Sequence, residues 1–182
     1  MRDPIAIGLF GFAVPLFILG AMFYGSVPMA GLGSELAICF SFGAAAMFVG
    51  GFLTFQMPNS YVATVFFTYG AFFLALGITG ADGSLAMTMK SSPQLLSVWF
   101  SLMAVITVIF MLAAFRLNVA LVIMFGVLAA AFILFVVGDV KLAAMLFMVD
   151  AVIGFYLGAV HIINPVMGHA VLPVGSLARK AA

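Results

Sequence analysis

Ionisable side chains inside long apolar runs are the first feature of this sequence that could carry chemistry. Asp150 is the one carboxylate well inside such a run, and His161 follows it eleven residues later. Eleven residues make about three helical turns, so both side chains are expected on one helix face. An ionised carboxylate in hydrocarbon is costly, so Asp150 must face protein or water, find a partner, or hold a proton. The two residues are candidates for a proton path; the alternative is a structural hydrogen bond for Asp150 and an interfacial position for His161.

Hydroxyl groups are a second source of chemistry. Tyr69 lies in an apolar run with Thr64 and Thr68 nearby. A small carboxylate that crosses an apolar neck needs a few donors to replace part of its hydration, and neutral hydroxyls do this without trapping the ion. The alternative for Tyr69 is a bond to the backbone of a neighbouring helix. Pro4 suits the first turn of a helix, where free N–H groups attract anions, although simple helix initiation explains it equally.

The composition defines the elements that must hold these residues. Of the 182 residues, 67% are hydrophobic and 6% are charged, whereas a water-facing surface carries roughly 25–35% charged residues. A soluble domain is excluded, and apolar runs of about 20 residues match a bilayer core of about 30 Å. The net charge of +1 argues against nucleic acid as a partner, and the single Cys39 excludes a disulfide framework or a Cys-based metal site within one chain.

Six apolar runs predict an all-α integral membrane protein with six transmembrane helices in a single domain, residues 1–182. The runs are continuous rather than alternating, which favours helices over barrel strands. Turn residues place the spans at about 5–25, 35–55, 61–79, 94–115, 118–137 and 140–163, with a turn at Pro58-Asn59 and with Asn164-Pro165 ending the last span. Within the spans, Pro15 is expected to kink the first helix and free a carbonyl near a path, and Glu35 to cap the second.

Lysine and arginine in the connections predict the orientation, because cytoplasmic connections carry more of them. With six spans, both termini share a side, and that side holds four of the six cations, which predicts cytoplasmic termini. The four are Arg2, Arg116, Arg179 and Lys180, and the other two are Lys90 and Lys141.

An internal repeat predicts how the spans are arranged. Gly11-Phe12, Tyr69-Gly70 and Gly126-x-Leu128 recur at spacings near 58 residues, the length of one two-helix hairpin. Three helical hairpins around a central path would bring the bulky residues beside these glycines to one depth. Small residues such as the Gly154-x-x-x-Gly158 pair allow close helix packing, either within one protomer or between protomers.

Three blocks of sequence resemble the signatures of one family. They are Asp3–Leu9 (DPIAIGL) followed by Gly11-Phe12, Phe67–Phe73 (FTYGAFF) and Gly168–Gly175 (GHAVLPVG). In this order, and over nearly the whole chain, they resemble the acetate uptake transporter family, also called the succinate-acetate permease family. In that family the first block begins with Asn, where this chain has Asp3.

The resemblance implies a six-helix protomer that assembles as a homohexamer in the inner cell membrane, with a hydrophobic constriction in each protomer. Phe12, Tyr69 and Leu128 align with the constriction. The resemblance also implies transport of acetate and similar small monocarboxylates, in some members succinate, as a channel or as a proton symporter. Further residues expected along the substrate path are Pro4, Gly8, Thr64, Thr68, Gly70 and Phe72.

Departures from the family pattern keep other functions open. Where relatives carry Gln and Glu in the second span, this chain has Met47 and Thr54, and two Glu positions late in the sixth span are His161 and Pro165. A six-helix channel for a neutral solute such as urea or a short amide is therefore the alternative. A non-transporting subunit that assembles a membrane complex is a rival of another class. No nucleotide loop, catalytic triad or metal-ligand cluster is visible, so neither an enzyme nor a cofactor is expected.

Overall fold

The structure is a computed structural model that describes residues 3–28, 32–57, 60–81 and 90–177. Within these residues six helices are long and apolar enough to cross a membrane, which confirms the six-span prediction. The turn Pro58-Asn59 and the cations Arg2, Arg179 and Lys180 lie outside the described residues. The elements in chain order are α1 (Ile5–Tyr24), α2 (Leu32–Ile38), the π-helix η2 (Cys39–Ala44), α3 (Ala45–Thr54), α4 (Tyr61–Ala81), α6 (Pro93–Ala114), α7 (Val119–Val137) and α8 (Val140–Met167).

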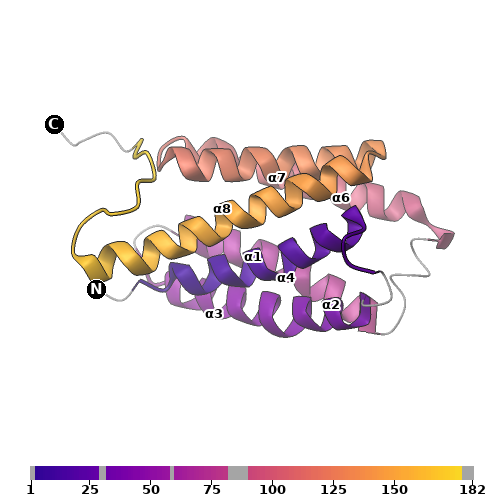
Figure 1. Cartoon of the computed structure of the whole chain (residues 1–182), viewed down its shortest axis with the longest axis horizontal. Helices are drawn as coiled ribbons and strands as arrows, with labels where there is room; N and C mark the ends of the chain where they lie inside the picture. The colour runs from indigo at the N-terminus through magenta and orange to yellow at the C-terminus, as the bar shows by residue number, and fades with distance from the viewer. Residues whose placement is uncertain (1–2, 29–31, 58–59, 82–89, 178–182) are drawn as a thin grey trace.

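The helices surround a common interior, and the last one returns to the first. α1 packs along α8, α3 along α4, α6 along α7, and α7 along α8. α4 and α6 meet through side chains, as where the Tyr61 hydroxyl donates to the Phe110 carbonyl at 2.8 Å. Figure 1 shows α8 crossing beside α1, with the first and last described residues at the same end of the bundle. An even number of spans returns the chain to the side where it began, since each span crosses the membrane once.

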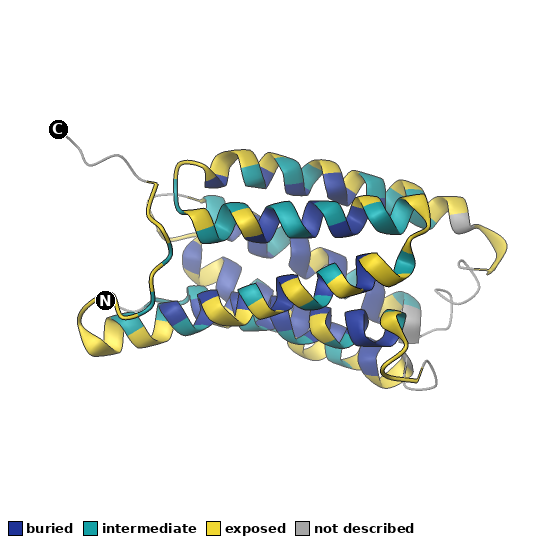
Figure 2. Ribbon diagram, turned by 45° about the horizontal axis from the view of Figure 1, so that its top comes forward, coloured by how far each residue is buried: buried dark blue, intermediate teal, exposed yellow. Residues whose placement is uncertain are grey.

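The bundle is apolar on its outer surface as well as inside. Figure 2 shows exposed residues along the outward faces of the helices and buried residues toward the interior. The exposed side chains include Phe52, Leu102, Leu112 and Val137, each more than half accessible. Apolar side chains on both faces of a helix are expected where lipid replaces water outside.

Glycines bring α1 and α8 into close contact. A methyl group at Gly20 would lie 2.8 Å from the Ala144 carbonyl oxygen, and one at Gly158 would lie 2.5 Å from the ring of Phe10. Gly154 also lies against α1, where a methyl group would lie 3.2 Å from Ala13 Cβ and 3.4 Å from the Phe12 ring. The Gly154-x-x-x-Gly158 pair therefore packs within the protomer, because small residues let two backbones approach where lipid supplies no hydrophobic drive.

The backbone carbonyl that Pro15 frees lies at a contact between helices. α1 is a continuous helix through Pro15. The carbonyl that a proline leaves without its intrahelical partner is that of the residue four positions earlier, here Gly11. The Gly11 carbonyl oxygen and the Pro15 ring both lie against Gly43 in η2. The proline and the π-helix therefore pack together at a helix contact, and the freed carbonyl faces a neighbouring backbone.

Two further expectations about helix ends are corrected. Pro165 does not end α8, which continues to Met167 and stops at Gly168 in the left-handed conformation, with φ 73°. A glycine in that conformation is the usual helix terminator, while a proline near the end removes one backbone bond. Glu35 lies in the first turn of α2, but it is buried, and its Oε1 accepts a hydrogen bond from the Cys39 Sγ–H at 2.9 Å. It faces the interior because Cys39, one turn later, lies on the same buried face.

Candidate functional site

A cavity of about 260 Å³ enters the bundle from the end where both termini lie. Asn118 at the start of α7, His161 near the end of α8 and Val174 in the C-terminal segment line its mouth. Its inner end is closed by Phe12 of α1 and Tyr69 of α4, both buried. Most of the lining is apolar, and no lysine or arginine belongs to it among the described residues. The cavity suits a small solute with an apolar part.

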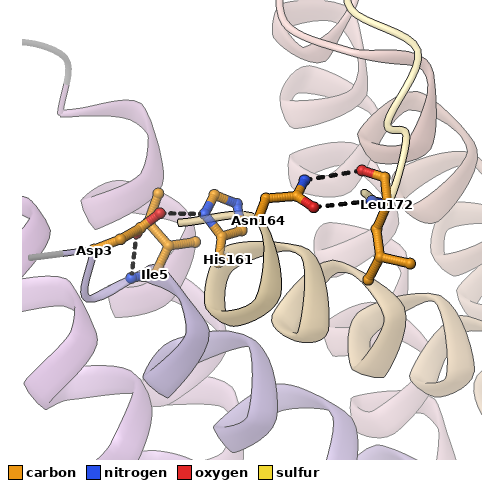
Figure 3. A network of polar contacts seen from close by, with 5 residues as sticks. All are labelled: Asp3, Ile5, His161, Asn164 and Leu172. Atoms are coloured by element: carbon orange, nitrogen blue, oxygen red, sulfur yellow. Dashed lines mark hydrogen bonds and ion pairs between the residues drawn. The ribbon is translucent and has the colours of Figure 1, made fainter. Parts of the chain in front are cut away.

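A polar contact joins α1 to α8 at the mouth, as Figure 3 shows. The Asp3 Oδ2 atom lies 2.6 Å from His161 Nδ1, and both side chains are about a quarter exposed. The other carboxylate oxygen of Asp3 accepts a hydrogen bond from the Ile5 backbone N–H at 3.1 Å. Asp3 therefore fixes the first turn of α1 and holds His161 at the edge of the cavity.

The C-terminal segment is held beside the mouth by one side chain (Figure 3). The Asn164 carboxamide donates to the Leu172 carbonyl and accepts from the backbone N–H groups of Val171 and Leu172, each at 2.9 Å. The segment then runs to α7, where the Ala120 N–H donates to the Val174 carbonyl at 3.1 Å. Figure 1 shows this crossing from the end of α8 to the start of α7. These bonds keep Val174 in the cavity wall.

The three residues expected at a constriction lie together in the buried interior. Phe12 and Tyr69 pack edge to face, with ring centroids 5.5 Å apart. Leu128 is fully buried in the same hydrophobic cluster and lies one turn of α7 deeper than Met124, which lines the cavity. The cavity thus stops at two aromatic rings, with Leu128 beyond them. We call Phe12, Tyr69 and Leu128 the neck.

The Tyr69 hydroxyl is held by a residue that the sequence analysis missed. Thr107 of α6 is buried, and its Oγ1 lies 2.7 Å from the Tyr69 hydroxyl. Thr107 Oγ1 also donates to the Met103 carbonyl at 2.7 Å. A threonine hydroxyl has one proton, so the Tyr69 O–H is the donor in the shared bond. In this state the Tyr69 proton is directed at Thr107, while the tyrosine oxygen keeps its capacity to accept.

Thr64 and Thr68, expected as donors along the path, lie outside the cavity lining. Thr64 is exposed on α4, and its hydroxyl donates to the Ser60 carbonyl at 3.0 Å. The Thr68 hydroxyl donates to the Thr64 carbonyl at 2.8 Å. Both hydroxyls bond to their own helix, a common arrangement for threonine within membrane helices.

Four other expected path residues also lie outside the cavity lining and serve helix packing or initiation. A methyl group at Gly8 would lie 2.4 Å from the Phe66 ring, and one at Gly70 would lie 3.0 Å from the Phe48 ring. Both glycines therefore permit close helix contacts. Phe72 is buried and packs on the rings of Trp99, Phe100 and Phe132, with ring centroids 5.0 to 5.8 Å apart. Pro4 precedes the first residue of α1.

Asp150 and His161 are not brought together. His161 lies at the mouth with Asp3, whereas Asp150 is completely buried and does not line the cavity. Neither carboxyl oxygen of Asp150 has a hydrogen-bond partner within the described residues. The two residues share one face of α8, as predicted, but they lie at different depths in the bundle. Among the described residues, no group of three His, Cys, Asp or Glu side chains is placed to hold a metal ion.

The fold and site define a multi-pass helical membrane protein with an interior cavity that ends at a buried neck. Residues 1–179 match the GPR1/FUN34/yaaH family, and the chain belongs to that family. It is 25% identical over 182 residues to the succinate-acetate/proton symporter SatP of Escherichia coli strain K12, covering 96% of both chains. It is 26% identical over 152 residues to acetate permease A of Emericella nidulans, covering 76% of this chain and 50% of that protein.

The resemblance extends to a solved structure. A structure described as the bacterial acetate channel SatP matches this fold with a TM-score of 0.88 at 25% sequence identity. The match covers 96% of this chain and 99% of that one. The six-helix framework of this protein is therefore that of the solved channel over nearly its whole length.

Proposed function

We propose that this protein is a transporter or channel for acetate and similar small monocarboxylates, and not an enzyme. The observation that carries the proposal is the apolar cavity that ends at Phe12 and Tyr69, with Leu128 beyond, in a framework shared with a solved acetate channel. The names of the family relatives, a succinate-acetate/proton symporter and an acetate permease, support the same substrate.

The lining favours movement of the neutral acid, or of the anion together with a proton. No lysine or arginine side chain lines the described cavity, so a bare carboxylate would lose its hydration without gaining a counter-charge. The polar groups of the lining are few: Asn118 and His161 at the mouth, and Tyr61 and Tyr69 within. Protons are therefore the proposed second substrate.

The same apolar lining suits a neutral solute, which keeps urea or a short amide as the second candidate. A competition measurement separates the two. If acetate is the substrate, excess urea leaves acetate uptake unchanged, whereas excess unlabelled acetate suppresses it. Uptake of labelled urea that unlabelled acetate does not affect would establish the second candidate instead.

We further propose a homohexamer in the inner cell membrane with both termini in the cytoplasm. The apolar outer surface supports a location within lipid or against other protomers, including an apolar groove between α6 and α7 lined by Ala104, Val108 and Ile133. Arg116 precedes Leu117, whose carbonyl accepts a hydrogen bond from the Leu177 N–H, so this cation lies near the C-terminal end of the described chain, which supports the proposed orientation. Native mass spectrometry in detergent tests the hexamer, and labelling of cysteines placed at each end tests the orientation.

The direct test of the function is uptake of radiolabelled acetate into proteoliposomes, with and without an inward proton gradient. Empty liposomes at the same pH are the essential control, because neutral acetic acid crosses lipid unaided. Protein-dependent uptake that the gradient increases is the expected result. No uptake above that of empty liposomes would refute the acetate assignment.

A further inference from the structure

Asp150 lies on the inward-facing stripe of α8, between the cavity and the far side of the bundle. Leu157, Val160 and His161 of this stripe line the cavity, and Gly154, one turn deeper, lies against Phe12. Asp150 is one further turn from the mouth. A carboxyl group thus follows directly after the point where the Phe12 ring closes the cavity.

The contact between α7 and α8 places Asp150 at the depth of Leu128. The rings of Phe132 and Phe147 lie 5.6 Å apart, and the two helices run in opposite directions. Leu128 lies four residues nearer the mouth than Phe132, a rise of about 6 Å along α7. Asp150 lies three residues nearer the mouth than Phe147, a rise of about 4.5 Å along α8. Asp150 and Leu128 therefore lie at nearly the same level, just beyond Phe12 and Tyr69.

Within the part of the chain that the structure describes, the helices around Asp150 supply no cation to balance an ionised carboxylate. α8 packs against α1 and α7; α7 has no ionisable side chain, and α1 has only Tyr24, at its exposed end. α6 has none, and the ionisable groups of α4 are Tyr61 and Tyr69, which are neutral phenols at physiological pH. The other ionisable groups of α8 are Lys141 and Tyr156, which are exposed, and His161, which contacts Asp3.

We propose that Asp150 is a proton-binding site at the neck, occupied by a proton in this closed state. The buried carboxyl, with neither oxygen partnered among the described residues and no cation beside it, is compatible with a neutral acid and not with a bare anion. This inference deepens the proposed function and rests on it, since it assigns the proton of proton-linked transport to one side chain.

The transfer is a simple exchange of one proton. When a carboxylate substrate reaches the neck, the O–H bond of Asp150 breaks and a new O–H bond forms on a carboxylate oxygen of the substrate. The substrate passes as the neutral acid and releases its proton to water on the far side, and the Asp150 carboxylate is then reprotonated by a hydronium ion from the side of higher proton concentration. One proton accompanies each substrate molecule, and the proton gradient drives the reprotonation of Asp150.

The protonation of Asp150 is measured without transport, by infrared spectroscopy of the purified full-length protein at neutral pH. Asp150→Asn removes the titratable group with almost no change of shape, so the fold is expected to persist. The matched control is Asp139→Asn, at the start of the same helix, where the side chain accepts a bond from the Leu142 N–H and asparagine caps equally well. The part of the protonated-carboxyl C=O stretch that belongs to Asp150, which shifts in D2O, should be absent from D150N and retained in D139N, while any part from the buried Glu35 is the same in all three proteins. An unchanged band in D150N would overturn the proposal.

The coupling is then measured in proteoliposomes. Wild type and D139N should take up acetate faster when an inward proton gradient is imposed. In D150N acetate uptake should fall, and the uptake that remains above empty liposomes should no longer increase when the gradient is imposed. Full gradient stimulation in D150N would refute Asp150 as the proton site. If wild type moves no acetate at all, the proposed function fails, and the infrared result still decides the state of Asp150.

Discussion

Replacing Thr107 with valine tests how the neck tyrosine is held. The substitution keeps the shape of the side chain but removes the acceptor for the Tyr69 O–H, 2.7 Å away in a fully buried position. An unsatisfied hydroxyl in the core of a soluble protein costs about 1–3 kcal/mol. Hydrogen bonds between membrane helices average about 0.6 kcal/mol with a maximum of about 1.7, because the unfolded chain in the membrane also finds partners. We therefore expect T107V to lower the free energy of unfolding by about 0.6–1.7 kcal/mol.

The assay is reversible unfolding of the purified protein in mixed micelles, applied to a set of variants. Thr107→Ser is the control, since it retains the hydroxyl and removes one methyl group. Tyr69→Phe removes the donor but leaves Thr107 bonded to the Met103 carbonyl, so it should cost less than T107V. In the double variant the phenylalanine removes the unsatisfied hydroxyl, and part of the loss seen in T107V should be recovered.

Two outcomes would refute this reasoning. If T107V is as stable as T107S, the hydroxyl of Thr107 contributes nothing to holding Tyr69. If the losses in T107V and Y69F simply add in the double variant, the two side chains do not interact, because independent sites add and coupled ones do not.

Three more predictions follow from the packing and the mouth. Gly20→Ala should destabilise the bundle by about 1–3 kcal/mol, because its methyl group would lie 2.8 Å from the Ala144 backbone oxygen. Gly126→Ala, whose methyl group would have its nearest neighbour at 3.6 Å, should be neutral or stabilising by up to about 1 kcal/mol. Thermal unfolding that ranks the two variants in the opposite order would contradict the packing. Leu128→Ala should widen the neck, so uptake of propionate and butyrate should increase relative to acetate, and unchanged size selectivity would count against the neck. Asn164→Ala should release the C-terminal segment, because it removes three hydrogen bonds at 2.9 Å; faster hydrogen exchange at residues 171–174 is the expected signal, and wild-type protection there would refute this role.

The sequence predicted that Phe12, Tyr69 and Leu128 would lie together in the interior, but it did not point to Thr107, which contacts Tyr69 there. Phe12, Tyr69 and Leu128 stand beside or near glycines at a regular spacing and align with a family constriction, and the structure places them in one buried cluster. Thr107 lacks such a marker. Hydroxyls at Thr64 and Thr107 look alike along the chain, yet one is exposed and the other fully buried. A helix that is apolar all round has no polar face to show which side turns inward.

The mouth of the cavity depends on contacts between distant parts of the chain. Asp3 and His161 are 158 residues apart and meet at 2.6 Å. Each alone has an ordinary explanation, Asp3 as a helix-start residue and His161 as an interfacial side chain. Their meeting requires α1 and α8 to lie side by side, which the small residues Gly20, Gly154 and Gly158 make possible at close range.

The sequence by itself determined the class of the protein and its six spans, because crossing a bilayer depends on the length and composition of each apolar run and on little else. It also placed Asp150 well inside a span, where it must face protein or water, find a partner, or hold a proton. Only the packing of the helices determines which faces turn inward, that Tyr69 donates to Thr107, and that Asp150 is completely buried while His161 lies at the mouth of the cavity. These outcomes depend on the rotation and closeness of the helices, which shape and small residues set when every face is apolar.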